Sequence, residues 1–146
     1  MECFDENSLY GLFIRVIKLH YLKIHHLLES LDIYPGQPPL LISLHKKDGQ
    51  SQAELAKKIK VKPATLTIML KRIEKAGLIE KRQDEQDQRV QRVYLTEKGR
   101  KTCEKLKDIL KCIESECFKD FTPEERENLN VLLRKIAGNL ESSFKK

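Results

Sequence analysis

The sequence predicts a mainly α-helical protein with one small β-hairpin. Apolar residues recur at helical spacing in five segments, whereas only residues 78–95 alternate as two short strands around a polar turn. A short capped helix, a turn and a second helix precede that hairpin directly, which is the spacing of a helix-turn-helix motif. We therefore expect a winged helix-turn-helix domain with further helices before and after it.

The first predicted helix runs from Leu9 to Leu31 and carries apolar residues on more than one face. One domain cannot easily bury so wide an apolar surface. Residues 35–39, Pro-Gly-Gln-Pro-Pro, then form the expected connector to the winged domain, because consecutive prolines prevent a helix from continuing.

Residues 51–76 are predicted to form the helix-turn-helix. Ser51 and Glu54 have the spacing of a capping box, in which each side chain bonds the backbone amide of the other residue. Residues 60–62 form the turn, and Pro63 suits the first position of the second helix because its missing N–H needs no partner there. The buried face of that second helix is expected to contain Leu66, Met69, Leu70 and Ile73.

The opposite face of the second helix suits the major groove of DNA. Small or apolar side chains can touch thymine methyl groups and hydroxyls can reach base acceptors, which assigns base contacts to Ala64, Thr65, Thr67 and Ile68. The basic residues would hold phosphates, and these are Lys62, Lys71, Arg72 and Lys75. The alternative is an ordinary amphipathic helix with a charged, solvent-facing side.

The hairpin after this helix is basic and rich in turn residues. Its polar turn spans residues 84–88, and in the return strand Val93 and Leu95 can pack inward. Arg89 lies near the tip, where it could enter a minor groove and read the groove width. The alternative is a solvated hairpin whose Asp and Arg charges cancel.

Residues 34–99, and more loosely the whole chain, resemble the MarR family of bacterial winged-helix transcription regulators. The matching segments are Gln52–Ala56, Ala64–Thr67, Arg72–Ile79, Asp84–Arg89 and Leu95–Gly99. In that family the wing carries an Asp-x-Arg element, matched here by Asp87 and Arg89, in which the Asp braces the Arg as it enters the minor groove. The resemblance therefore implies a DNA-binding role for both residues, and we place Arg92 of the wing with them.

Two positions depart from the family pattern. Family members often have Arg or another polar residue where this chain has Ile68, and isoleucine cannot form a bidentate contact to guanine. Sequence preference would then depend on thymine methyl groups and DNA shape. Gln88 stands where an Arg is frequent, which removes one potential phosphate contact.

The remaining helices are predicted to form a dimer. The helices from Thr96 to Cys117 and from Pro123 onward carry apolar residues at helical spacing. Such helices would interleave with those of a second subunit in a two-fold homodimer, an intramolecular bundle being the alternative. We expect dimerisation helices at residues 1–33 and 121–146, the winged domain at 34–99 and a linking helix at 100–120.

A two-fold dimer predicts a pseudo-palindromic operator, because its recognition helices would lie about 34 to 36 Å apart, roughly one turn of DNA. The expected function is a repressor. In similar proteins a small ligand binds between the dimerisation helices and the winged domain and biases the geometry against DNA. The resemblance thus implies a small-molecule effector, whose expected pocket lining is His20, Ile24, Tyr34 and Leu44.

Composition agrees with a partner that is double-stranded DNA. The net charge of +6 favours a polyanion, although 22 acidic residues stand against 28 basic ones. The chain has no Trp and few aromatic residues for a membrane-surface helix, no run of about 18 apolar residues, and an acidic N-terminus unlike a signal peptide. We expect a cytoplasmic protein without a membrane partner.

Cysteine and histidine spacing predicts no cofactor. The four cysteines contain no Cys-x-x-Cys pair, and Cys103 and Cys117 are expected to pack as small hydrophobic residues. Some MarR relatives sense oxidants through a cysteine near the N-terminus, so Cys3 is the candidate for an oxidant-responsive regulator, a plain terminal thiol being the alternative. His20, His25 and His26 lack the spacing of a zinc site, which leaves a metal-responsive regulator as a minor alternative.

No catalytic motif is present. The chain has no glycine-rich phosphate loop, no His-Glu-x-x-His helix and no Gly-x-Ser-x-Gly elbow, so we do not expect an enzyme. The competing function is a helical adaptor that uses the winged domain to bind protein. Such an adaptor would lack the steep salt dependence of a DNA-binding protein.

Overall fold

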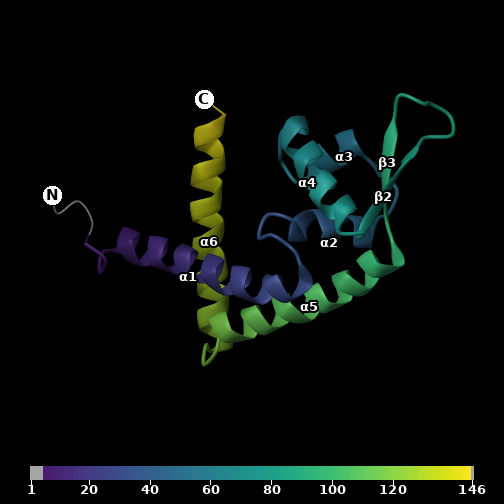
Figure 1. Cartoon of the computed structure of the whole chain (residues 1–146). Coiled ribbons are helices and arrows are strands. Elements are labelled where there is room, and N and C mark those ends of the chain that lie inside the picture. Colours follow the sequence, from purple (N-terminus) through teal and green to yellow (C-terminus); the bar gives the residue numbers. More distant parts are fainter. Residues whose placement is uncertain (1–4, 146) are drawn as a thin grey trace. The chain divides into compact units, whose positions relative to one another are not determined.

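Six α-helices and a three-stranded antiparallel sheet make up residues 5–145 in the computed structural model (Figure 1). This confirms the predicted fold class. The elements in order are α1 (Leu9–Leu28), the 3-10 turn η1 (Glu29–Leu31), α2 (Pro38–Lys46), β1 (Gln50–Ser51), α3 (Gln52–Lys58), α4 (Pro63–Lys75), β2 (Ile79–Gln83), β3 (Gln91–Leu95), α5 (Glu97–Cys117) and α6 (Pro123–Phe144). The chain divides within α5 into two units, one up to Leu110 and one from Lys111 onward.

The sheet has the strand order β1-β3-β2. Strands β2 and β3 form the predicted hairpin, with Ile79 opposite Leu95. Strand β1 is only two residues long and pairs with the other edge of β3, so that Ser51 lies opposite Arg92. Because Ser51 is also the N-cap of α3, this short strand joins the start of the helix-turn-helix to the wing.

The predicted connector at residues 35–39 is wrong in its second half. Pro38 and Pro39 occupy the first turn of α2, a nine-residue helix that the sequence analysis missed. Proline is tolerated at that turn because its absent N–H has no partner inside the helix. The connector therefore ends at the buried Gln37, whose Oε1 accepts a hydrogen bond of 3.1 Å from the amide of Tyr34.

A continuous apolar core lies beneath α2, α3 and α4 and one face of the sheet. The core extends into α5, where Cys103 is buried. Gly99 of the same helix lies so close to Leu78 that a Cβ at residue 99 would come within 2.0 Å of the Leu78 carbonyl oxygen. Burial also raises the pKa of the Cys103 thiol to about 11, which keeps that thiol protonated. The core members with no exposed surface include Leu28, Leu40, Leu41, Leu44, Leu55, Leu70, Val93 and Leu106.

The helices at the two ends of the chain differ from the winged domain because they expose large apolar residues. Helix α1 buries only Gly11 and Leu28, and α6 has no buried residue. Cys117, in the last turn of α5, is also exposed, so the expectation that it packs as a core residue is wrong for the single chain. Cys3 lies outside the described residues.

Between residues 5 and 145, no helix combines the length and the low polarity that crossing a membrane requires. The same residues contain no group of three or more His, Cys, Asp or Glu side chains placed to hold a metal ion.

Candidate nucleic-acid interface

Helix α4 is the predicted recognition helix, and its burial pattern divides it into two faces. Leu66, Leu70 and Ile73 are buried against the core. The helix begins at Pro63, with Lys62 as an extended N-cap residue whose side chain makes no capping bond. The N-terminal turn of α4 and one full side of the helix are therefore free to meet DNA.

Three of the four residues predicted to read bases are exposed on α4. Ala64 and Thr65 lie in its first turn, and the side chain of Ile68 is 58% exposed one turn later. Thr67 differs, since it is half-buried and its hydroxyl donates a hydrogen bond of 3.0 Å to the Pro63 carbonyl. Its donor is therefore used within the helix, as is common for threonine in helix interiors.

The residues predicted to hold phosphates lie on the same side of α4. Lys62, Lys71 and Lys75 are exposed. Arg72 is also exposed, but its guanidinium carbon lies 4.9 Å from the centre of the Tyr34 ring, in cation–π contact. Tyr34 thus supports a side chain of the recognition helix from the connector before α2. The sequence contains no local signal for this contact because the two residues are far apart in the chain.

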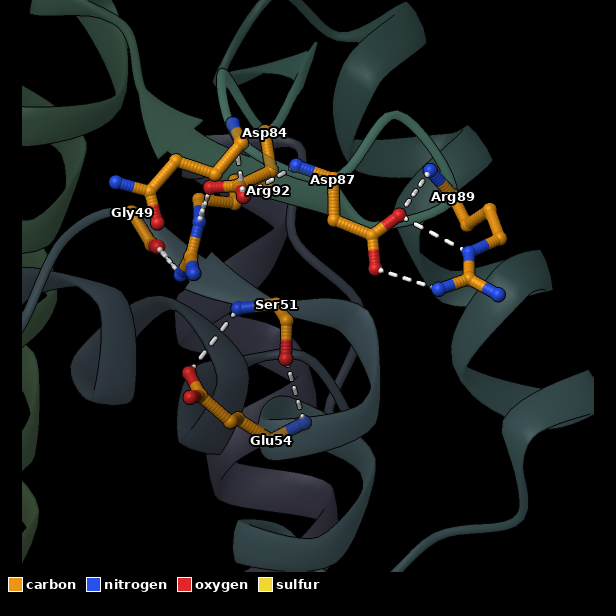
Figure 2. Close-up of polar contacts among 8 residues, drawn as sticks. Gly49, Ser51, Glu54, Asp84, Asp87, Arg89 and Arg92 are labelled. Carbon is orange, nitrogen blue, oxygen red and sulfur yellow. Dashed lines mark hydrogen bonds and ion pairs between the residues drawn. The ribbon is translucent and has the colours of Figure 1, made fainter.

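At the tip of the wing, Asp87 holds Arg89 by hydrogen bonds (Figure 2). The two oxygens of the Asp87 carboxylate accept hydrogen bonds from Arg89 Nε at 3.0 Å and from Arg89 Nη2 at 3.2 Å, and Oδ1 also accepts from the Arg89 amide at 3.1 Å. These bonds hold the pKa of Asp87 below its ordinary value. The Arg89 side chain is nevertheless 91% exposed, so its charge remains available to a ligand.

Arg92, the third wing residue expected to contact DNA, makes two hydrogen bonds within the protein. Its Nε donates to Asp84 Oδ1 at 2.7 Å and its Nη1 donates to the Gly49 carbonyl at 3.0 Å (Figure 2). The hydrogen bond from Arg92 is the main cause of the lowered pKa of Asp84, and the same bond raises the pKa of Arg92. The guanidinium of Arg92 is therefore bound within the protein, with most of its side chain covered.

Asp84 is a functional candidate that the sequence analysis did not single out. Its Oδ2 accepts hydrogen bonds from the amides of Gln86 and Asp87, at 3.3 and 3.1 Å. An aspartate at the start of a polar turn commonly bonds the amides two or three residues later. That local preference was the signal available in the sequence.

The four residues expected to line a ligand pocket differ in exposure. Leu44 has no exposed surface, because it is part of the core beneath α2. Tyr34 is exposed and lies against Arg72 of the recognition helix. His20 is exposed on α1 and Ile24 packs against the core.

The fold and the exposed basic groups define a winged helix-turn-helix transcription regulator, and comparisons with known proteins identify the family. The MarR family model matches residues 33–90. The HTH-type transcriptional regulator YybA of Bacillus subtilis is 31% identical over 116 residues, which cover 80% of this chain and 77% of YybA. The chain therefore belongs to the MarR family.

Two solved structures of similar proteins contain DNA. The S. aureus MepR–DNA complex is 27% identical, with a TM-score of 0.82 over 90% of this chain and 98% of MepR. A mutant of MarR from E. coli, complexed with operator DNA, is 29% identical, with a TM-score of 0.77 over 88% of this chain and 92% of that protein. DNA-binding transcription regulation is thus the function class of this chain.

Proposed function

We propose that the protein is a homodimeric transcriptional repressor that binds a pseudo-palindromic operator through α4 and the wing. The main observation behind this proposal is the environment of Arg89. Its side chain is almost fully exposed at the wing tip, yet its orientation is fixed because Arg89 donates three hydrogen bonds to Asp87. A cation so presented suits the narrow, electronegative minor groove of A·T-rich DNA. The exposed lysines of α4 would bind the flanking phosphates.

The composition of the exposed face of α4 supports a preference for thymine. Ile68 lies at the middle of that face, with Ala64 one turn before it, and both can contact a thymine methyl group but cannot hydrogen-bond to guanine. Lys71 and Arg72 follow one turn later, where their charges can reach phosphates. We therefore expect half-sites in which thymine is enriched at the base pairs beneath Ile68.

The homodimer is supported by exposed apolar residues on the terminal helices. On α6 the exposed apolar residues recur at helical spacing, and contiguous apolar surface of this kind marks an interaction site. They include Leu132, Leu133, Ile136, Leu140 and Phe144. Helix α1 adds a second set with Leu9, Leu12, Val16, Ile17 and Leu19.

Release from DNA by a small ligand stays a prediction that comes from the family resemblance. Such a ligand would need a higher affinity for a form of the protein that does not bind the operator. Operator binding measured with and without candidate ligands tests this.

The test of the proposed function begins with selection of bound sequences from a random duplex library by the full-length protein. We expect an inverted repeat with half-sites about one DNA turn apart. Affinity for that duplex should fall steeply as salt rises, because binding releases counterions from the phosphates. No enrichment and a flat salt response would instead favour the protein-binding adaptor.

Arg89→Ala then tests the wing in the selected duplex. We expect affinity to fall by about 1 to 3 kcal/mol while the protein stays folded and keeps its molar mass. Gln88→Ala is the matched control, because Gln88 is an exposed neighbour in the same turn. Equal affinity of Arg89→Ala and the wild type would remove Arg89 from DNA binding.

A further inference from the structure

We propose that Asp84 and Arg92 are positioning residues that hold the wing in the conformation in which Asp87 presents Arg89 to DNA. This inference rests on the proposed function, in which Arg89 is the DNA contact of the wing. It assigns Arg92 to the support of the wing instead of to direct contact with DNA.

Asp84 organises the turn that carries Asp87 and Arg89. Its Oδ2 accepts a hydrogen bond of 3.1 Å from the amide of Asp87, and a second one from the amide of Gln86. The backbone closes the same turn, since the amide of Asp84 donates to the Val90 carbonyl and the amide of Val90 donates to the Asp87 carbonyl. The Asp84 side chain therefore fixes the backbone position from which Asp87 reaches Arg89.

Arg92 anchors Asp84 to the body of the winged domain. Its guanidinium bridges Asp84 Oδ1 and the Gly49 carbonyl, at 2.7 and 3.0 Å. Gly49 precedes β1 and has a φ of +69°, and a Cβ there would come within 2.8 Å of the Tyr94 ring, so this approach requires glycine. Because β1 leads directly into the capping box of α3, Arg92 connects the wing turn to the start of the helix-turn-helix.

The supporting side chains of this series are largely buried, whereas the side chain offered to DNA is exposed. The side chains of Asp84 and Arg92 are 21% and 33% exposed, whereas that of Arg89 is 91% exposed. Figure 2 shows the order, from Gly49 through Arg92 and Asp84 to Asp87 and Arg89. Lysine could not replace Arg92 in this role, because one ammonium group lacks the planar fork that bonds two acceptors in fixed directions.

A double-mutant cycle with full-length protein and the selected duplex tests the proposal. We expect Asp84→Asn to weaken binding about tenfold in the wild-type background, within the range for a lost base or groove contact. In the Arg89→Ala background the same substitution should change affinity by less than about twofold, because the group that Asp84 positions is already gone. Equal losses in both backgrounds would overturn the proposal.

Glu85→Gln is the matched control for Asp84→Asn. It removes one negative charge from the next residue of the same turn, and the Glu85 side chain is exposed. Loss of a negative charge near DNA should by itself leave affinity equal or slightly higher. If Glu85→Gln weakened binding as much as Asp84→Asn, charge and not position would explain the effect, and the proposal would fail.

Arg92→Lys distinguishes positioning from direct phosphate binding. A phosphate contact needs mainly the charge, so Lys would preserve most of the affinity, whereas we expect a loss comparable to that of Asp84→Asn. The loss should again disappear in the Arg89→Ala background. Wild-type affinity of Arg92→Lys would return Arg92 to the phosphate contacts and contradict the proposal.

Hydrogen exchange keeps the proposal testable if a variant is poorly folded. In the wild type, we expect the Asp87 amide to exchange more slowly than the Glu85 amide, because the Asp87 amide donates a hydrogen bond to Asp84 Oδ2. In folded Asp84→Asn or Arg92→Lys that protection should decrease while the amides of α4 are unaffected. An Asp87 amide unprotected in the wild type would contradict the proposal, whereas a wild type that binds no duplex would contradict the proposed function instead.

Discussion

The winged domain buries its apolar residues, whereas helix α6 exposes them. In the winged domain Leu40, Leu55, Leu70 and Val93 have no exposed surface, whereas no residue of α6 is buried. Both regions nevertheless contain apolar residues at regular spacing and start a helix with a capping box. A helix owes most of its stability in proteins to packing of its apolar face. The difference indicates that one chain completes the winged domain, while α6 needs a further surface, which the proposed dimer would supply.

We expect the largest effect from a charged residue introduced on the exposed apolar surface of α6, because it should weaken the dimer without affecting the winged domain. Leu133→Asp would place an unpaired carboxylate in the proposed interface twice per dimer, and we expect the dimer dissociation constant to rise at least about a hundredfold. Asn130→Asp is the control, because residue 130 accepts a hydrogen bond from Arg134 and aspartate keeps that acceptor. Analytical ultracentrifugation measures both variants. A dimer unaffected by Leu133→Asp would place the interface elsewhere.

A core substitution in the winged domain should have the next largest effect. Leu70 is fully buried in α4, so Leu70→Ala should lower the free energy of unfolding by about 2 to 5 kcal/mol. Ile68→Ala is the control on the same helix, since Ile68 is mostly exposed and its loss should leave stability almost unchanged. Urea unfolding at one fixed protein concentration compares them. Similar losses for both variants would mean that α4 does not bury the face described here.

The two capping boxes allow the winged domain and α6 to be compared by equivalent substitutions, with smaller expected effects. Ser51 accepts a hydrogen bond from the Glu54 amide and Thr122 accepts one from the Glu125 amide, both at 3.1 Å. Alanine at either cap should cost about 1 kcal/mol of stability. If α6 is fixed only in the dimer, the cost of Thr122→Ala should appear as weaker association, whereas Ser51→Ala should lower stability without changing the dimer constant. The reverse assignment would contradict the comparison.

The sequence predicted those parts of the molecule that depend on neighbouring residues. The capping box of Ser51 and Glu54, the turn before Pro63 and the polar turn of the wing have local signals. The sequence does not predict helix α2, because consecutive prolines favour a helix stop, and it does not predict β1, because two residues are too few to show alternation. Ala64, Thr65 and Ile68 are exposed on α4, as the sequence predicts, and Asp87 contacts Arg89, as the family resemblance implies.

The parts that sequence analysis could not give depend on contacts between distant residues. Alternation along β3 places Arg92 on the face opposite Val93 and Leu95, but it says nothing about an acceptor such as the Gly49 carbonyl, which is far away in the chain. Arg72 reaches Tyr34 across the same kind of separation. Leu44 is buried by the packing of α2, a helix whose contacts with the rest of the core have no local signal in the sequence.

The smallest expected effect concerns pH. The pKa of Asp84 is lowered chiefly by its hydrogen bond with Arg92, and that of Asp87 by its hydrogen bond with Arg89, from an ordinary value of 3.8. Because the folded-state pKa values lie below those of the unfolded chain, their stabilising contribution is fully present above about pH 4 and is lost as pH falls through the folded-state values. Amide NMR signals of Asp87 and Arg89 should stay constant from about pH 8 to about pH 5. A transition near neutral pH would contradict the wing contacts described here.

The stoichiometry of the DNA complex tests the central claim most directly. Native mass spectrometry of the full-length protein with the selected inverted-repeat duplex should show two copies of the 17.1 kDa chain on each duplex, and Arg89→Ala should reduce that complex while leaving the free dimer intact. One copy on each saturated duplex, or a complex that does not respond to Arg89→Ala, would contradict the account of a dimer that binds DNA through α4 and the wing.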